Sequence, residues 1–201
     1  MLTQSELDQL AEELGLTENR ATQLFKPLVQ LLAEGKPVSM EQLASATGKP
    51  RDQVVRALAE SPSTEFDEHG NIIGAGLTLN PTPYRFALNG HTLYTWCALD
   101  TLIFPALLGQ TAYVSSPTPG TGFLVQVTVT PDQVEAVDPP TAVVSIVKRA
   151  ADPDVRRAFC NYVHFFSSAD VATSWVPQHP DAILLPVADA FALGRRVAAR
   201  L

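Results

Sequence analysis

The chemistry of this 201-residue chain centres on its two cysteines, Cys97 and Cys160, and on Asp100, three positions after the first. A carboxylate beside a thiol can take its proton, which matters because a free Cys is only a few per cent thiolate at neutral pH. The charge of an ionised Asp opposes a thiolate next to it. We therefore expect Asp100 to share a proton with Cys97, which suits a reaction that ends by protonating something. An isolated Cys-x-x-Asp is more often a solvated Asp beside a packed Cys.

The second cysteine is expected where a short charged helix gives way to a strand. If the strand begins at Cys160, Tyr162 and His164 share its face. His164 could then complete a zinc site with Cys97, Asp100 and Cys160. Zinc sites usually contain a close ligand pair such as Cys-x₂-Cys, which this sequence lacks. We therefore predict that His164 is a hydrogen-bonded structural residue.

Composition indicates a globular protein, with 46% hydrophobic and 17% charged residues, and the next two features predict a cytoplasmic one. The first residues, MLTQSELDQLAEELG, show no basic start followed by an apolar run, so we expect no signal peptide. The longest apolar stretch, 102–108, is interrupted by Pro105 and is far shorter than the ~20 residues of a membrane helix. In a reducing cytoplasm both cysteines would be thiols. No dinucleotide fingerprint, P-loop or nucleophile elbow is found, so we expect no organic cofactor.

The first part of the chain is predicted to be a winged-helix-like domain, residues 1–80, that ends before a Pro-Thr-Pro stretch. Ser39 and Gln42 resemble a capping box, and Thr17 is a candidate cap for the second helix. The expected elements are helices over 5–14, 17–32, 40–46 and 51–59, and a hairpin over 65–79 with its turn at 69–71. This part holds twelve acidic against six basic residues, a poor surface for DNA. We therefore expect it to cover or support the site and to bind no nucleic acid.

The second part, residues 81–201, is predicted to be a mixed α/β catalytic domain with a small, mainly antiparallel sheet, which makes the whole chain α+β. A helix over 93–107 would place Cys97 and Asp100 on one face. The other expected elements are strands over 84–88, 112–115, 123–129, 142–147 and 163–166, and helices over 169–176 and 187–201.

Two long segments resemble those of the organomercurial lyases, the alkylmercury lyase family. Residues 93–109, LYTWCALDTLIFPALLG, are similar to the family's first active-site segment, and Val114-Ser115-Ser116 matches the strand after it. Residues 157–166, RAFCNYVHFF, are similar to the segment with the second cysteine. The resemblance covers most of the chain, including the winged-helix-like part and the closing helix with 190–194, AFALG. Some members carry further cysteines where this chain has Thr118 and Asn161, but the family does not need them for its chemistry.

The resemblance implies that Cys97, Asp100 and Cys160 are the catalytic trio of a carbon–mercury lyase. Cys97 would be the attacking ligand, Cys160 the second ligand and Asp100 the group that carries the proton. Mercury, which prefers soft thiolates, would be held by Cys97, Cys160 and Asp100 as substrate and product rather than as a cofactor. Trp96 and Phe159 would make the site apolar.

The resemblance also implies partners: an organomercurial substrate, small cytosolic thiols needed for turnover, and mercuric reductase as the recipient of Hg(II). No membrane partner is expected. Two other functions stay open on the residues alone, a zinc-dependent hydrolase and a winged-helix regulator that senses metals or thiols.

Overall fold

The N-terminal region is helical in the computed structural model, which describes residues 2–14, 22–148, 150 and 152–201. Its described helices are α1 (Gln4–Glu13), α2 (Thr22–Leu32), α3 (Met40–Thr47) and α4 (Arg51–Ala59). The predicted capping box starts α3: the Ser39 backbone N–H donates to the Gln42 side chain at 2.8 Å, and the Gln42 N–H donates to Ser39 Oγ at 3.2 Å. The cap predicted at Thr17 lies outside the described residues.

The predicted hairpin comes after these helices and confirms the winged-helix-like arrangement. Strands β1 (Glu65–Phe66) and β2 (Ile72–Ala75) are antiparallel. Asp67 Oδ1 ties their turn by accepting the backbone N–H groups of His69 at 2.9 Å and Asn71 at 2.8 Å. A second turn at Gly76, where φ is 79°, leads into β3 (Leu77–Thr78).

One antiparallel sheet continues from this hairpin into the second part of the chain. Its eight strands are ordered β1-β2-β3-β5-β4-β6-β7-β8. The further members are β4 (Tyr84–Leu88), β5 (His91–Thr95), β6 (Ala112–Pro117), β7 (Leu124–Val129) and β8 (Val134–Asp138). The α+β class and the antiparallel sheet are confirmed. The sheet is larger than predicted, because β5 and β8 were not expected and because β3 pairs with β5, across residue 80.

The predicted helix over 93–107 is wrong in its first part. Residues His91–Thr95 form β5, and α5 (Ala98–Leu108) begins only after Cys97. Leu93 and Thr95 are buried whereas Thr92 is exposed, which is the alternation of a strand. Pairing with β3 on one side and β4 on the other outweighs the helical spacing of the apolar residues. Cys97 therefore lies at the start of the helix rather than on its face.

A second antiparallel sheet, ordered β10-β9-β11, carries the other cysteine segment. Its strands are β9 (Val143–Ile146), β10 (Phe165–Phe166) and β11 (Ile183–Pro186), and α6 (Val155–Ala158) and the 3₁₀ turn η1 (Cys160–Tyr162) precede β10. The strand predicted over 163–166 is only the two-residue β10. Because Cys160–Tyr162 form a 3₁₀ turn, the condition that would place Cys160, Tyr162 and His164 on one strand face is not met. The helix predicted over 169–176 is the short α7 (Ala169–Ala172) followed by the 3₁₀ turn η2 (Val176–Gln178).

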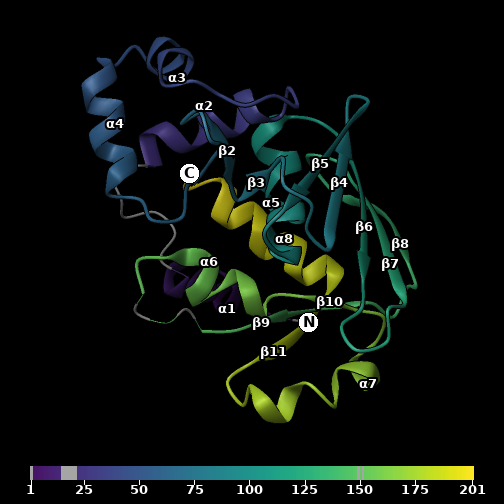
Figure 1. Ribbon diagram of the computed structural model, residues 1–201. Helices are drawn as coiled ribbons and strands as arrows, with labels where there is room; N and C mark the ends of the chain where they lie inside the picture. The colour runs from purple at the N-terminus through teal and green to yellow at the C-terminus, as the bar shows by residue number, and fades with distance from the viewer. Residues whose placement is uncertain (1, 15–21, 149, 151) are drawn as a thin grey trace.

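Helix α5 packs against the closing helix, α8 (Val187–Ala198), in the middle of the molecule (Figure 1). Strands β4, β6, β7 and β8 of the main sheet lie to one side of this pair, and helices α2, α3 and α4 lie to the other. Gly194 allows the close approach, since a Cβ there would lie 3.3 Å from the carbonyl carbon and oxygen of Leu102. The buried α5 is thus a rigid support for the residues at its start. Within the described ranges, no helix is long and apolar enough to cross a membrane.

Candidate active site

Cys97 and Asp100 are held together by the way α5 begins. Cys97 is the N-cap residue, and its backbone N–H donates to Asp100 Oδ2 at 3.2 Å. The Asp100 backbone N–H in turn faces the Cys97 sulfur, which completes a capping box with a cysteine in the place of the usual Ser or Thr. The helix N-terminus and the Asp100 N–H favour the Cys97 thiolate, but burial outweighs both.

Cys160 is held near the start of α5 by the loop that follows it in the sequence. The Val163 carbonyl accepts the Ala98 backbone N–H at 3.1 Å, so the first peptide of α5 is tied to the second cysteine segment. The buried Tyr84 hydroxyl donates to the same carbonyl at 3.1 Å. These two contacts fix Cys97 and Cys160 relative to each other although they are far apart in the sequence.

The structure brings all three predicted site residues together. The thiol sulfurs of Cys97 and Cys160 and a carboxylate oxygen of Asp100 lie within 4.8 Å of one another. Both cysteines are buried, with exposed fractions of 0% and 4%. Two buried soft sulfur donors beside one proton-carrying oxygen of the half-buried Asp100 can bind a soft metal and deliver a proton next to it.

Burial sets the protonation of the cluster. It raises the pKa of the Cys97 thiol well above its ordinary value, and the hydrogen bond to Cys160 and the charge of Asp100 raise it further. For Cys160 the hydrogen bond from Cys97 lowers the pKa, but burial and the charge of Asp100 outweigh it, so this pKa is also raised. Burial raises the pKa of Asp100 to about 6, against the hydrogen bonds from Cys97 and Trp96. Near neutral pH the cluster therefore holds two protonated thiols and a carboxylate that readily accepts a proton.

His164 is not part of this cluster. Its Nδ1 lies 2.5 Å from Tyr84 Oη. The ring is also hydrogen-bonded to the Asn161 backbone. Burial and the nearby His179 lower the pKa of His164 to about 4, so the ring is neutral. The prediction of a hydrogen-bonded structural histidine is confirmed.

Two charged residues beside the cluster were not identified from the sequence as parts of the site. The Arg156 guanidinium stacks over the Trp96 ring, 5.4 Å from its centroid, and forms an ion pair with Glu65. Glu65 also accepts the Trp96 indole N–H at 3.1 Å. Glu65 and Arg156 are 91 positions apart, so no local pattern could have paired them. The sequence did indicate Trp96 and Phe159 as apolar neighbours, and both are buried.

Comparison with known proteins covers nearly the whole chain. Residues 77–199 match the family model of alkylmercury lyase, and residues 6–76 match that of the helix-turn-helix domain of alkylmercury lyase. An alkylmercury lyase of Streptomyces lividans is 58% identical over 172 residues, which cover 86% of this chain and 80% of that protein. The one of Staphylococcus epidermidis is 55% identical over 177 residues, covering 88% and 82%.

A solved structure, the crystal structure of the mercury-bound form of MerB2, shares the fold with a TM-score of 0.79. It is 25% identical, and the match covers 98% of this chain and 99% of that one. Neither the zinc hydrolase nor the thiol-sensing regulator is favoured by these matches. Both parts of the chain match the same family and the three chemistry-bearing side chains meet at the start of α5, so the chain belongs to the alkylmercury lyase family.

Proposed function

We propose that this chain cleaves the carbon–mercury bond of R–Hg⁺ by protonation, with Cys97, Cys160 and Asp100 as the catalytic residues. The observation that carries the proposal is the cluster of two buried sulfurs and one carboxylate oxygen of the half-buried Asp100 within 4.8 Å. A linear two-coordinate metal can reach two sulfurs at this spacing, and the oxygen lies beside both.

The first step is capture at Cys97. An organomercurial bound to a small thiol exchanges that thiol for the Cys97 sulfur, and the Cys97 proton leaves on the displaced thiol. The position of Cys97 at the N-terminus of α5 supports this role, because the helix dipole stabilises the developing thiolate. One sulfur on mercury leaves the carbon–mercury bond intact.

The second step adds Cys160 and ends in protonation. The Cys160 thiol gives its proton to the Asp100 carboxylate as its sulfur binds mercury, which pushes electron density through mercury onto carbon. Asp100 then delivers that proton to the carbon, R–H departs, and Hg(II) stays on two sulfurs. A pKa of about 6 suits Asp100 for this task, since general acid–base groups work best near the operating pH.

Release of the product needs further thiols. Two small cytosolic thiols return their protons to Cys97 and Cys160 and carry Hg(II) away, with mercuric reductase as its recipient. No organic cofactor is needed for these steps. The need for small thiols supports a location in the reducing cytoplasm, where they are abundant.

The test is incubation of the purified chain with phenylmercury and excess thiol, followed by measurement of benzene. We expect one benzene per phenylmercury consumed and, in a separate single turnover without added thiol, one Hg(II) held per chain. The matched control is the Cys97→Ser/Cys160→Ser variant under the same conditions. Benzene release no faster than in this control would contradict the proposal.

A further inference from the structure

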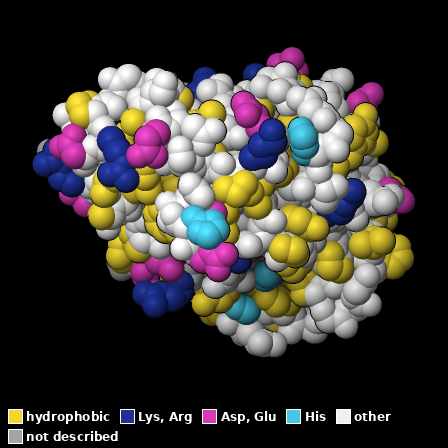
Figure 2. Space-filling model, turned by 45° about the horizontal axis from the view of Figure 1, so that its top comes forward, with side chains coloured by type: hydrophobic (Ala, Val, Ile, Leu, Met, Phe, Trp, Pro, Cys, Tyr) yellow, Lys and Arg dark blue, Asp and Glu magenta, His cyan; other side chains and the backbone are white. Residues whose placement is uncertain are grey.

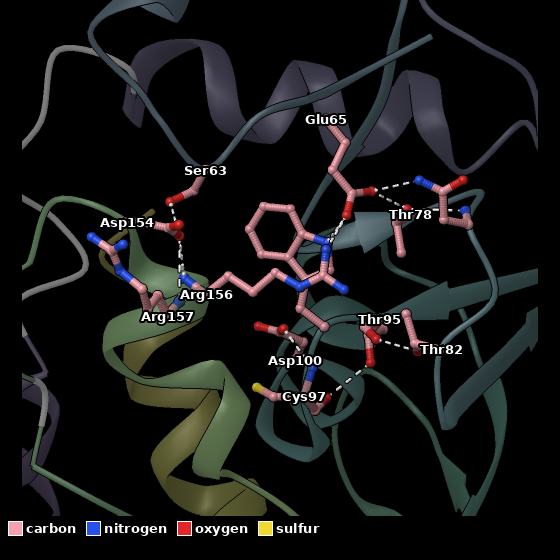
Figure 3. A network of polar contacts seen from close by, with 12 residues as sticks. Ser63, Glu65, Thr78, Thr82, Thr95, Cys97, Asp100, Asp154, Arg156 and Arg157 are labelled. Carbon is pink, nitrogen blue, oxygen red and sulfur yellow. Dashed lines mark hydrogen bonds and ion pairs between the residues drawn. The ribbon is translucent and has the colours of Figure 1, made fainter.

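The sulfur atoms of the cluster are covered, although an organomercurial must reach them. Trp96, directly before Cys97, has an exposed fraction of only 5%. Arg156, four residues before Cys160, lies over its indole ring. The stacked pair therefore joins the two cysteine segments. Figure 3 shows the Arg156 side chain reaching across between Glu65 and the Cys97–Asp100 pair.

Glu65 holds this stacked pair, Trp96 and Arg156, which we name the cover, from the N-terminal region. One carboxylate oxygen accepts the Trp96 indole N–H at 3.1 Å and pairs with the Arg156 guanidinium. The other accepts the Thr78 hydroxyl at 2.5 Å and the Asn80 side-chain N–H at 3.2 Å. The carboxylate is thus fixed by four donors, two of them on the sheet side and two on the cover.

The sheet leaves a space shaped for this carboxylate. A Cβ on Gly74 would lie 2.2 Å from Glu65 Oε2, so any larger residue would displace it. Ser63, two residues before Glu65, also binds α6. Its Oγ accepts the Val155 backbone N–H at 2.8 Å and donates to Asp154, the N-cap of that helix, at 3.2 Å. Residues 63–65 therefore fasten the element that leads into Cys160.

The Arg156 side of the cover is the part that can open. The Arg156 side chain is 40% exposed, whereas that of Glu65 is only 17% exposed. Water can replace the contacts of Arg156 without unfolding the sheet, while Glu65 keeps its bonds to Thr78 and Asn80. An ion pair with one exposed partner is weak enough to break locally.

We propose that Glu65 is a positioning residue that acts through Trp96 and Arg156. It latches Trp96 and Arg156 together and with them the two cysteine segments, and reagents reach the buried sulfurs when the Glu65–Arg156 ion pair opens. The inference rests on the proposed function only for the identity of the reagent, an organomercurial. Access to the thiols can be measured without turnover, so the two proposals fail separately.

The test is the rate at which N-ethylmaleimide, a small uncharged reagent, alkylates the cysteines of the folded protein, followed by mass spectrometry. Glu65→Gln keeps the shape of the side chain but removes its charge, and Arg156→Gln removes the other partner. We expect each variant to react faster, on the order of tenfold, because the open form is more populated. Glu41→Gln, which breaks the exposed Arg51–Glu41 ion pair between α3 and α4, is the matched control and should react like the wild type.

Two further measurements separate a latch from a merely structural contact. The double variant Glu65→Gln/Arg156→Gln should react no faster than the quicker single variant, since both remove the same latch. With phenylmercury, kcat/KM for Glu65→Gln should rise while kcat does not, because only entry is eased. Urea unfolding shows that each variant is folded during labelling.

Unchanged labelling in folded Glu65→Gln and Arg156→Gln would overturn the inference, as would effects that multiply in the double variant. Should Glu65→Gln fail to fold, labelling of Arg156→Gln tests the inference by itself, because the Arg156 side chain is 40% exposed and its loss leaves the core intact. Faster labelling without any hydrocarbon release would support the latch and contradict the proposed lyase activity.

Discussion

At the residue scale, the two sulfurs and the carboxylate have different roles in the reaction with mercury. Cys97→Ser should abolish turnover, because a hydroxyl is a hard, weakly acidic ligand that cannot replace a thiolate on mercury. Cys160→Ser should also cripple turnover but still capture R–Hg⁺ at Cys97. Mercury-binding stoichiometry measured beside single-turnover hydrocarbon release distinguishes the two. Wild-type turnover by Cys97→Ser would exclude Cys97 as the attacking ligand.

The role of Asp100 as a proton carrier can be separated from its role as a cap. Asp100→Asn keeps an oxygen for the Cys97 N–H but loses the proton, so capture should persist while release of R–H slows by about 10²-fold or more. In the wild type, the release rate should rise with pH through about 6, as Asp100 becomes able to accept a thiol proton. That limb of the pH profile should vanish in Asp100→Asn. Release at the wild-type rate would make Asp100 structural.

The same substitution should stabilise the protein. Burial raises the pKa of Asp100 from 3.8 to about 6, so the folded state binds this proton more tightly than the unfolded state does. The free energy of unfolding therefore falls as pH rises through about 6, by at most ~3 kcal/mol. Asp100→Asn escapes this loss. In urea, the free energy of unfolding of Asp100→Asn should exceed that of the wild type at about pH 8, and the difference should shrink towards about pH 4. A variant that is less stable than the wild type at both pH values would contradict the electrostatic account.

At the scale of the element, the start of α5 matters more than its face. Cys97 and Asp100 meet because they are the N-cap and the third residue of a helix, a local geometry that any capping box produces. The body of α5 is buried and packs closely against α8 at Gly194, so the position of Cys97 depends on that helix contact.

The contact between α5 and α8 is tested by adding volume at Gly194. Gly194→Val places methyl groups against the Leu102 backbone, where a Cβ alone would already lie at 3.3 Å. We expect a loss of about 1–3 kcal/mol in the free energy of unfolding, the usual cost of overpacking. Ala188→Val, on an exposed position of the same helix, is the matched control and should change stability by only a few tenths of a kcal/mol. Equal effects at both positions would mean that α8 can shift freely.

At the scale of the whole molecule, the N-terminal region has the helices of a DNA-binding fold but a different surface. Arg51 and Arg56 of α4 are paired with Glu41 at 2.5 Å and Asp52 at 2.6 Å. Figure 2 shows basic and acidic side chains side by side on this face of the molecule rather than a basic stripe. Ser63 and Glu65 of this region instead bind Val155 and Arg156, in the segment that leads to Cys160.

We therefore expect no DNA binding in an anisotropy titration at low salt, where phosphate contacts are strongest. A basic helix-turn-helix protein serves as the positive control. Tight binding that weakens steeply with added salt would show that this region contacts phosphates, and the support role would need to be abandoned.

The sequence by itself determined the parts of this protein that depend on near neighbours. The capping box at Ser39, the turn at 69–71 and the closing helix are local patterns, and the structure has them. The two cysteine segments could be recognised as family motifs because each is continuous, and that was enough to indicate Cys97, Asp100 and Cys160.

Only the tertiary structure decided the features that depend on distant partners. The helix prediction failed over β5 because its apolar spacing fits either period, and pairing with β3 and β4 settles the choice. The exposed edge strand β8 carries little apolar signal and forms by pairing with β7. Glu65 and Arg156 are ordinary charged residues in the sequence, and they become part of the cover of the site only because the fold brings together positions 91 apart. Electrostatic and packing energies act through space, so no pattern along the chain contains them.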